Sequence, residues 1–418
     1  MHYNMNIKTL ITGTGIHSCL GTNTRQLVEA LRIGKCGLHH DPSRKACGYR
    51  SDLCGNVPDV DDHVLYGLSR AQLQCVSQPT RYALSAVQQA LSQAEISTVT
   101  LRTQRVSLIV SNDSTAEQMM QVGEVMQRRN DTRYLGAGAV FRSLNSTVSM
   151  NLASILGVHG LTLTVSAACA GGGHALGLGK MLIETGQADI VIVVGAQETG
   201  LSSMQSFDAL GVFSCTHVSP FGKERNGLAP SGGAACVILE NEHTFAERSP
   251  ELPALAQLSG YGFSSNGIAI STPDVGLEAV CMNNAVQNAQ LERTQIDVVL
   301  AHATGTPMGD KAEAEAITSC FPLGTYVVAT KGHTGHECWM AGVSQAVQAV
   351  QMLRYDFLPG VVGTEDCDFE MLNLVCDTFD FSAQHILCNA FGFGGTNSSF
   401  IISKPYLYGN NRNTLTSH

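Results

Sequence analysis

Short runs of apolar, mostly β-branched residues recur along this chain and alternate with segments of helical periodicity. Examples are "RVSLIVS" (105–111), "DIVIVVGA" (189–196) and "IDVVLAHA" (296–303). Runs that are apolar almost throughout are typical of strands buried on both faces, in a sheet covered by helices. The segments between them, such as 78–94, carry apolar residues at helical spacing. The alternation predicts an α/β fold.

Strand, small-residue loop and helix follow one another in the same order in each half of the chain. "LTLTVS" (161–166) leads to a glycine-rich loop and a helix, and "TYVVAT" (325–330) leads to the loop "KGHTGH" and another helix. The 418 residues also exceed the usual size of a single core. We therefore expect two similarly folded halves, 1–255 and 256–418, packed through a shared core.

Charge and cysteine content exclude several classes of protein. A formal net charge of -10 leaves no basic field to displace the counterions of a nucleic acid, so we expect no nucleic-acid partner. The 14 cysteines are scattered without a C-x-x-C pair, which indicates reduced thiols. The N-terminal stretch has no apolar signal core, and no apolar run approaches the ~18 residues that span a bilayer. We expect a cytoplasmic protein with no membrane insertion.

One cysteine directly follows a predicted strand, in "TLTVSAACAGGGHALGLG" (162–179). Cys169 lies where a helix would begin, and the partial positive charge of a helix N-terminus lowers the pKa of a thiol. The small residues after it would let a substrate carbonyl approach the backbone closely. Cys169 is therefore a candidate nucleophile. The alternative is a buried core cysteine, the ordinary role of one cysteine among 14.

Two histidines in the second half could meet this thiol. His302 ends the strand "IDVVLAHA", and His336 follows the strand "TYVVAT". Both leave parallel strands at the edge where α/β proteins build their sites. Two imidazoles opposite one thiol could bind the oxygen of an enolate or transfer protons. Each histidine alone could instead be structural, and a Cys-His-His metal site is disfavoured because the spacing is not compact.

Stretches along nearly the whole chain resemble the β-ketoacyl-acyl-carrier-protein synthases of the thiolase fold, and synthase I in particular. They are "LITGTGIHSCLGTN", "VSAACAGGGHALG", "SFDALGVFS", "SPFGKERNGLAPSGGAACVILE", "HATGTPMGDKAEAEAI", "ATKGHTGH" and "NAFGFGGTNSSFII". The resemblance implies two α/β halves forming a five-layered αβαβα core, no cofactor and no metal. It also implies an acyl carrier protein as partner, and a homodimer or a heterodimer with another ketosynthase-like chain.

The resemblance assigns a role to each candidate residue. Cys169 would take an acyl chain from the carrier protein, and His302 and His336 would stabilise the enolate left when malonyl thioester loses carbon dioxide. Phe393 would be a gating aromatic whose backbone N–H completes an oxyanion hole with that of Cys169. Lys331 would order the loop of the second histidine. Its alternative is an exposed lysine in a turn.

Further residues of the same motifs would bind substrate or support the site. The predicted substrate-binding residues are Thr304, Thr306, Phe391, Gly392 and Gly394. Thr304 and Thr306, together with Asp310 and Glu313, would also brace the loop of His302.

The chain departs from the family pattern at three positions. Trp339 replaces a glycine, which places a bulky indole beside the expected site and suggests a narrowed substrate path. Gln345 stands where a glutamate pairs with the loop lysine, so Lys331 would lose its usual ionic partner. Ala303 replaces the glycine after His302, which costs little unless its φ is positive.

The expected docking surface for an acidic carrier is sparse. Only Arg70 matches a basic position of the family around "GLSRAQLQCVSQPTRYAL". A second basic patch could come from Arg128, Arg129 and Arg133 in "QRRNDTR". These three arginines could equally belong to an ordinary solvated helix end.

Two functions follow from these observations. The first is an active condensing enzyme, a 3-oxoacyl synthase (an acyltransferase) of fatty-acid or polyketide-type chain elongation. The second is a chain-length-factor-like subunit, which pairs with an active synthase and shapes its acyl tunnel without turnover. The complete set of Cys169, His302 and His336 favours the enzyme. Trp339, Gln345 and the few docking arginines favour the partner subunit. A thiolase is a third, more distant reading, because thiolases use a second cysteine.

Overall fold

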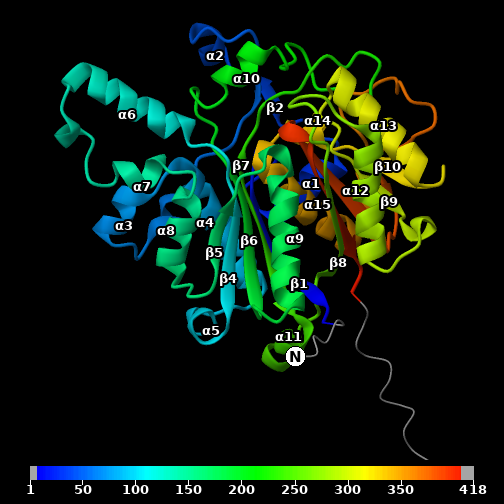
Figure 1. Ribbon diagram of the computed structural model, residues 1–418, viewed down its shortest axis with the longest axis horizontal. Helices are drawn as coiled ribbons and strands as arrows, with labels where there is room; N and C mark the ends of the chain where they lie inside the picture. Colours follow the sequence, from blue (N-terminus) through cyan, green and yellow to red (C-terminus); the bar gives the residue numbers. More distant parts are fainter. Residues whose placement is uncertain (1–6, 406–418) are drawn as a thin grey trace, which may run out of the picture.

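The computed structural model describes residues 7–405, whose main feature is one sheet of 11 strands (Figure 1). Along the sheet the order is β12-β10-β9-β14-β15-β8-β1-β7-β6-β4-β5. In that order the strands are Asn373–Leu374, Tyr326–Val328, Val298–Leu300, His385–Gly392, Thr396–Ser403, Ala256–Ser265, Thr9–His17, Gly233–Asn241, Ile190–Gln197, Val106–Ser111 and Thr162–Val165. Two small sheets pair β2 (Leu38–His40) with β3 (Leu53–Gly55), and β11 (Phe357–Leu358) with β13 (Phe379–Asp380).

The two ends of the sheet repeat one pairing pattern. Outward from β1, the pairs β1–β7 and β7–β6 are antiparallel, and the pairs β6–β4 and β4–β5 are parallel. Outward from β8, the pairs β8–β15 and β15–β14 are antiparallel, and the pairs β14–β9 and β9–β10 are parallel. β1 and β8 join the halves through the pairs Leu10↔Gln257 and Ile11↔Ala256. The repeated pattern agrees with two similar halves, while the division at residue 255 stays a prediction.

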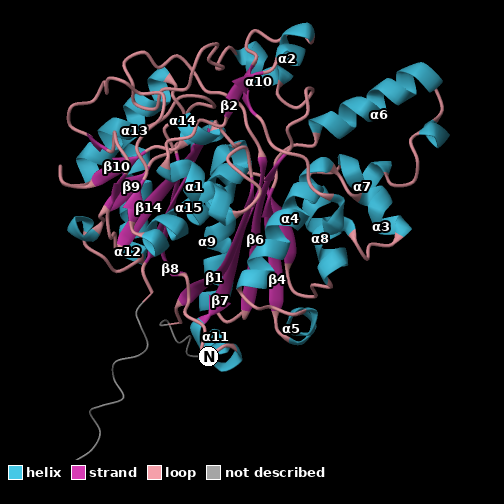
Figure 2. Cartoon of the chain, turned by 180° about the vertical axis from the view of Figure 1, so that it is seen from behind, coloured by secondary structure: helices cyan, strands magenta, loops and turns pink. Residues whose placement is uncertain are grey.

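Helices fill the layers on and between the two halves of the sheet (Figures 1 and 2). The central helices α9 (Gly171–Glu184) and α15 (Ala341–Tyr355) contact strands of both halves. On the outside, α4 (Gln78–Gln93) and α8 (Thr147–Leu156) pack on the first half, and α12 (Val275–Asn288) packs on the second with α13 (Pro307–Cys320) beside it. This arrangement confirms the predicted thiolase-like αβαβα core.

The remaining helices are short or peripheral. They are α1 (Thr24–Arg32), α2 (Pro42–Ala46), α3 (Arg70–Cys75), α5 (Thr98–Thr103), α6 (Ala116–Arg129), α7 (Ala139–Ser143), α10 (Gln205–Leu210), α11 (Glu242–Arg248) and α14 (Lys331–Thr334). In Figure 1, α6 projects from the body of the molecule, and none of its residues is buried.

The apolar runs of the sequence form the expected strands, but β8 and the short strands β2, β3, β11, β12 and β13 were missed. β8 (Ala256–Ser265) was not predicted, because its sequence "AQLSGYGFSS" has glycines and serines in place of an apolar run. Its residues alternate between buried and half-buried over most of its length, as in a strand with one covered face. Alternation among small residues is a weak signal, which explains the omission.

The central helices approach each other through glycines. A methyl group on Gly342 of α15 would lie 2.4 Å from the backbone nitrogen of Gly173, and one on Gly172 would lie 2.8 Å from the nitrogen of Val343. Real side-chain carbons do not come this close to backbone atoms, so only glycine fits. The contact fixes the first turn of α9 against the first turn of α15. The loops that precede these two turns carry Cys169 and His336.

We predict that Gly342→Ala lowers the free energy of unfolding by about 1–3 kcal/mol, because the added methyl group meets backbone that cannot move freely. Gly123→Ala on α6 is the matched control, since nothing lies within 4 Å of the added carbon. The control should be neutral or gain up to about 1 kcal/mol from better helix propensity. Thermal unfolding of the two variants measures the difference. Equal stability would contradict the close approach of α9 and α15.

Candidate active site

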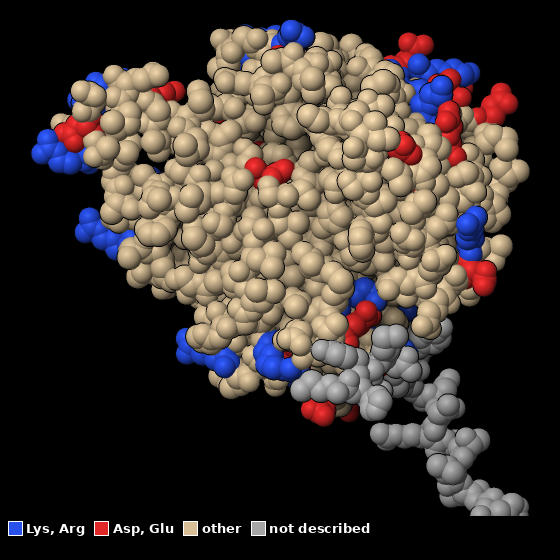
Figure 3. Space-filling model, in the orientation of Figure 1, with Lys and Arg blue, Asp and Glu red and all other residues tan. Residues whose placement is uncertain are grey.

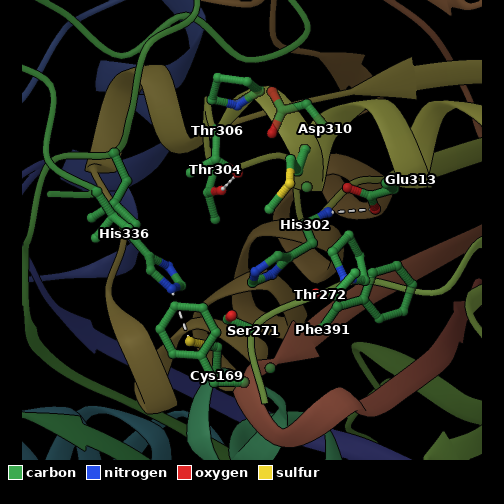
Figure 4. Close-up of a pocket in the computed structure, with 18 of the residues that line it drawn as sticks. Cys169, Ser271, Thr272, His302, Thr304, Thr306, Asp310, Glu313, His336 and Phe391 are labelled. Carbon is green, nitrogen blue, oxygen red and sulfur yellow. Dashed lines mark hydrogen bonds between the residues drawn. The ribbon is translucent and has the colours of Figure 1, made fainter. Parts of the chain in front are cut away.

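Cys169 lies in a short 3-10 turn, Ala168–Ala170, between β5 and α9. Ala168 has a left-handed φ of 45°, and its N–H donates a hydrogen bond of 3.0 Å to Asp113 Oδ2. This bond holds the strained turn in place. The turn brings the Cys169 thiol to within 3.0 Å of His336 Nε2, as the dashed line in Figure 4 shows. The predicted nucleophile and one predicted histidine are therefore in direct contact.

His302 completes the cluster. It follows β9, and its ring is perpendicular to that of His336, with centroids 5.3 Å apart and an interplanar angle of 87°. In Figure 4 the two imidazoles and the thiol face the same space. The halves of the chain thus bring one sulfur and two imidazoles together, as the sequence predicted.

Two carboxylates of α13 hold the loop that carries His302. Glu313 accepts hydrogen bonds from the backbone N–H groups of His302 (2.8 Å) and Ala303 (2.7 Å). Asp310 accepts from the N–H of Gly305 at 3.0 Å. Ala303 has a φ of 20°, at the edge of the left-handed region, so the substitution for glycine places a side chain in a less favourable conformation. The bond to Glu313 compensates for it.

Lys331 is buried rather than exposed in a turn. Its side chain is 3% exposed, and its ammonium donates a hydrogen bond to the carbonyl oxygen of His302. Burial lowers the pKa of Lys331, while the carboxylates of Glu313 and Glu337 oppose the shift. Glu337, which directly follows His336, is itself 3% exposed. Nothing in the sequence indicated this role for Glu337, because the carboxylate beside Lys331 was expected at position 345.

Gln345 takes a different role from a charge partner. Its side-chain N–H group donates a 3.0 Å hydrogen bond to the carbonyl oxygen of Ala301, at the end of β9. Gln345 therefore braces the strand that leads to His302. The loss of a glutamate at this position does not leave Lys331 without a nearby carboxylate, because Glu313 and Glu337 remain.

Burial sets the protonation of the cluster. Burial raises the pKa of the Cys169 thiol to about 12, although the nearby charge of Lys331 acts in the opposite direction and lowers this pKa. Burial and Lys331 together lower the pKa of His336 to about 3 and that of His302 well below its usual value. The expected lowering of the thiol pKa by the helix N-terminus is therefore outweighed by loss of solvent. At pH 7 the cluster therefore holds a neutral thiol and two neutral imidazoles.

The end of β14 and the loop after it close the site from another side. Phe391 lies 6.1 Å from the ring of His302, and Phe393 stacks on Phe207 at 6.2 Å. Gly392 lies against the backbone of the nucleophile, since a methyl group there would be 3.1 Å from the nitrogen of Cys169. Gly394 has a φ of 82°, and its N–H donates a 2.6 Å hydrogen bond to the carbonyl oxygen of Ile270.

A cavity of about 480 Å³ leads to Cys169. Its walls include most of the predicted residues, namely Cys169, His302, His336, Thr304, Thr306, Phe391, Gly392 and Phe393. Gly394 and Lys331 are outside the lining. The cavity also includes the loop 270–274 and Glu278, which sequence reasoning missed. No motif marks that segment, and only the fold brings it opposite His302.

Trp339 does not narrow this cavity. Its side chain is 4% exposed and packs in an apolar cluster behind the cavity wall, outside the lining. The cluster contains Tyr49, Met204, Phe213, Leu228, Cys338 and Trp339, with Phe207 packed against it. The prediction of a narrowed path is therefore wrong for the cavity that reaches Cys169, because the indole points into the core.

The predicted docking arginines lie away from the centre of the molecule. Arg70 begins α3, and Arg128 and Arg129 end α6. Arg133 is paired with Asp131 at 2.6 Å. On the face shown in Figure 3, basic side chains gather at the periphery, and the middle of the face is mostly uncharged. Among residues 7–405, no cluster of side chains could hold a metal ion.

Within the described part of the chain, no helix has the length and apolar character that a membrane span requires. The prediction of an N-terminus without a signal segment falls partly on residues 1–6, which lie outside the described residues.

Comparisons with known proteins match nearly the whole chain. Residues 8–244 match the family model "Beta-ketoacyl synthase, N-terminal domain", and residues 255–365 match "Beta-ketoacyl synthase, C-terminal domain". The 3-oxoacyl-[acyl-carrier-protein] synthase 1 of Escherichia coli K12 is 30% identical over 410 residues, covering 95% of this chain and 99% of that protein. The synthase 1 of Haemophilus influenzae is 28% identical, with the same coverage.

Solved structures share the fold. A β-ketoacyl synthase from Burkholderia phymatum STM815 has a TM-score of 0.90 at 22% identity, covering 96% of this chain and all of that one. The ishigamide ketosynthase/chain length factor has a TM-score of 0.89 at 23% identity and the same coverage. At these identities the likeness establishes the fold alone.

We predict that Lys331→Met slows alkylation of Cys169 by iodoacetamide. Lys331 lowers the pKa of the thiol, so its removal raises that pKa and reduces the thiolate fraction at any pH below about 12. A rise of one unit would slow labelling at pH 8 about tenfold. Mass spectrometry of the Cys169 peptide gives the rate. Lys311→Met, which removes an exposed lysine of α13, is the control and should leave the rate unchanged. Unchanged or faster labelling of the Lys331 variant would contradict this account of the site.

Proposed function

The chain belongs to the β-ketoacyl synthase family, and we propose that it joins an acyl group held on Cys169 to a malonyl unit, with loss of carbon dioxide. The observation that carries this proposal is the contact of Cys169 Sγ with His336 Nε2 at 3.0 Å, with His302 beside it, at the end of one cavity. The same reaction serves fatty-acid and polyketide-type elongation, and we place the protein in the cytoplasm. Acyl carrier proteins are the proposed donors of both thioesters.

In the first step the acyl group moves to the enzyme. The neutral His336 Nε2 accepts the thiol proton as Cys169 Sγ attacks the thioester carbonyl. The carbon–sulfur bond to the carrier breaks, and the carrier thiol leaves with the proton from His336. The imidazole returns to its neutral form. Its low pKa favours this return, because a charged ring is costly in a buried site.

In the second step a new carbon–carbon bond forms. Malonyl thioester loses its carboxylate as carbon dioxide, and the bonding electron pair becomes an enolate. Neutral His302 and His336 donate hydrogen bonds to the enolate oxygen, His336 after its ring proton has moved from Nδ1 to Nε2. The nucleophilic carbon attacks the acyl carbonyl, whose oxyanion is held by the backbone N–H groups of Cys169 and Phe393. The Cys169 thiolate leaves and takes up one proton, which completes the cycle.

The mouth of the cavity supports delivery by a carrier protein. Leu210, Ile270 and Met308 line the cavity and are 57%, 80% and 61% exposed, so they form an apolar rim. We infer that the carrier docks at this rim. Arg70 and the arginines 128, 129 and 133 would contact it at the periphery, and Phe393 would move aside when the thioester enters.

We also propose a dimer. β5 is the last strand of the sheet and is only partly buried, so one edge of its backbone has no neighbouring strand within the described residues. The projecting α6 lies on the same half of the molecule (Figure 1). An exposed strand edge is a ready surface for pairing with a second chain. The second chain at this edge would be either an identical chain or a related ketosynthase chain.

The alternative function is that of a chain-length-factor-like subunit. Trp339, Gln345 and the few docking arginines were the features that favoured it. Trp339 packs away from the cavity and Gln345 braces β9, so neither blocks the site. The complete site therefore favours the enzyme.

We predict that the isolated chain forms a 3-oxoacyl product from acyl- and malonyl-carrier proteins, and that Cys169→Ala abolishes the product. Mass spectrometry of the carrier-bound product measures both. Cys376→Ala, at an exposed cysteine, is the control and should retain activity. Product formation only when a second, co-eluting synthase-like chain is added, even with Cys169 replaced, would contradict the proposal and support the partner subunit.

A further inference from the structure

Glu278 is a buried carboxyl group that the mechanism does not use. It lies in the first turns of α12, is 2% exposed and lines the same cavity as Cys169 and His302. Its Oε2 atom is buried without a hydrogen-bond partner among the described residues. An unpaired polar atom in a buried position costs about 1–3 kcal/mol, so its presence in a substrate cavity needs an explanation.

The surroundings of Glu278 are acidic. Asp274 caps the same helix by accepting the N–H of Leu277 at 2.9 Å, and the charge of Glu313 on α13 acts on Glu278. No lysine or arginine forms an ion pair with Glu278 in the described chain. The carboxyl group therefore has neither a counter-ion nor a bound donor that would favour its charged form.

These neighbours keep Glu278 in its neutral form. Burial, followed by the charges of Glu313 and Asp274, raises the pKa of Glu278 to about 9. A protonated carboxyl group has one O–H donor and free acceptor positions. An amide is the neutral group whose donor and acceptor complement those of the carboxyl group. Its carbonyl oxygen would accept the carboxyl O–H, and its N–H would donate to Oε2.

We propose that Glu278 is a specificity-determining residue that binds an amide group of the arm on which the carrier protein presents its thioester. The proposal rests on the proposed function, because it takes a carrier thioester as the occupant of this cavity. The cavity that reaches Cys169 is also lined by Thr304 and Thr306, whose hydroxyl groups contact each other at 3.1 Å. Glu278 would thus add a neutral hydrogen-bonding group to the cavity that those hydroxyls also line.

The test compares a substrate that has amides with one that lacks them. Malonyl-pantetheine carries amide groups, whereas the malonyl thioester of a simple alkanethiol has none. KM and kcat for release of carbon dioxide are measured for the wild type, Glu278→Leu and Glu278→Gln. Glu315→Gln, at an exposed carboxylate of α13, is the control.

Glu278→Leu should raise KM for malonyl-pantetheine about tenfold, with kcat little changed, because one buried hydrogen bond is lost. KM for the alkanethiol ester should not rise. Glu278→Gln keeps a neutral donor and acceptor and should resemble the wild type. Above pH 9 the wild-type KM for malonyl-pantetheine should also rise as Glu278 ionises, whereas that of Glu278→Gln should stay constant.

Three outcomes would overturn the inference. One is an equal change in KM for both thioesters in Glu278→Leu, which would indicate a general disturbance of the cavity. The second is unchanged binding of free pantetheine by that variant in calorimetry, and the third is no binding of free pantetheine by the wild type. The binding measurement needs no turnover, so it separates failure of this inference from failure of the condensing function.

Discussion

Removal of solvent from the space between the two halves is the physical constraint on which the site depends. The Cys169 thiol, the His336 imidazole and the Lys331 side chain are buried beside the half-buried His302, and the cost of charge in such a place decides which of these groups is ionised. Burial lowers the pKa of Lys331, and the nearby Glu313 and Glu337 oppose the loss of its positive charge. With that one positive charge present, both imidazoles stay neutral. Neutral rings can accept a proton from Cys169 in one step and donate hydrogen bonds to an enolate in the next.

The fold creates this space through the close approach of its central helices. Gly172 and Gly342 let the first turns of α9 and α15 touch, and the turns carrying Cys169 and His336 lie directly before them. The loop of His302 is held from α13 by Glu313. Each reactive group is thus positioned by a different rigid element, and backbone hydrogen bonds fix the loops. This is the arrangement that preorganised sites require.

Much of the fold and the reactive cluster could be predicted from the sequence. Long apolar runs marked the strands, and the motifs around Cys169, His302 and His336 identified residues that the structure brings together. The failures concern properties set by packing. The helix N-terminus suggested a lowered thiol pKa, but burial raises it. Trp339 seemed to face the substrate path, but its ring lies in the core. Glu278 carried no signal, because only tertiary contacts show that a helical glutamate is buried in a cavity.

The central claim is that Cys169 and His336 rest as a neutral pair. The most direct measurement is a nuclear magnetic resonance titration of the enzyme with 15N-labelled histidine, in which ring nitrogen shifts distinguish neutral from protonated imidazole. We expect the rings of His302 and His336 to remain neutral from pH 8 down to pH 5, since the pKa of His336 is lowered to about 3. Free labelled histidine in the same buffer provides the reference for a ring that does titrate in this range. A protonated His336 at pH 7, paired with a Cys169 thiolate, would contradict the account.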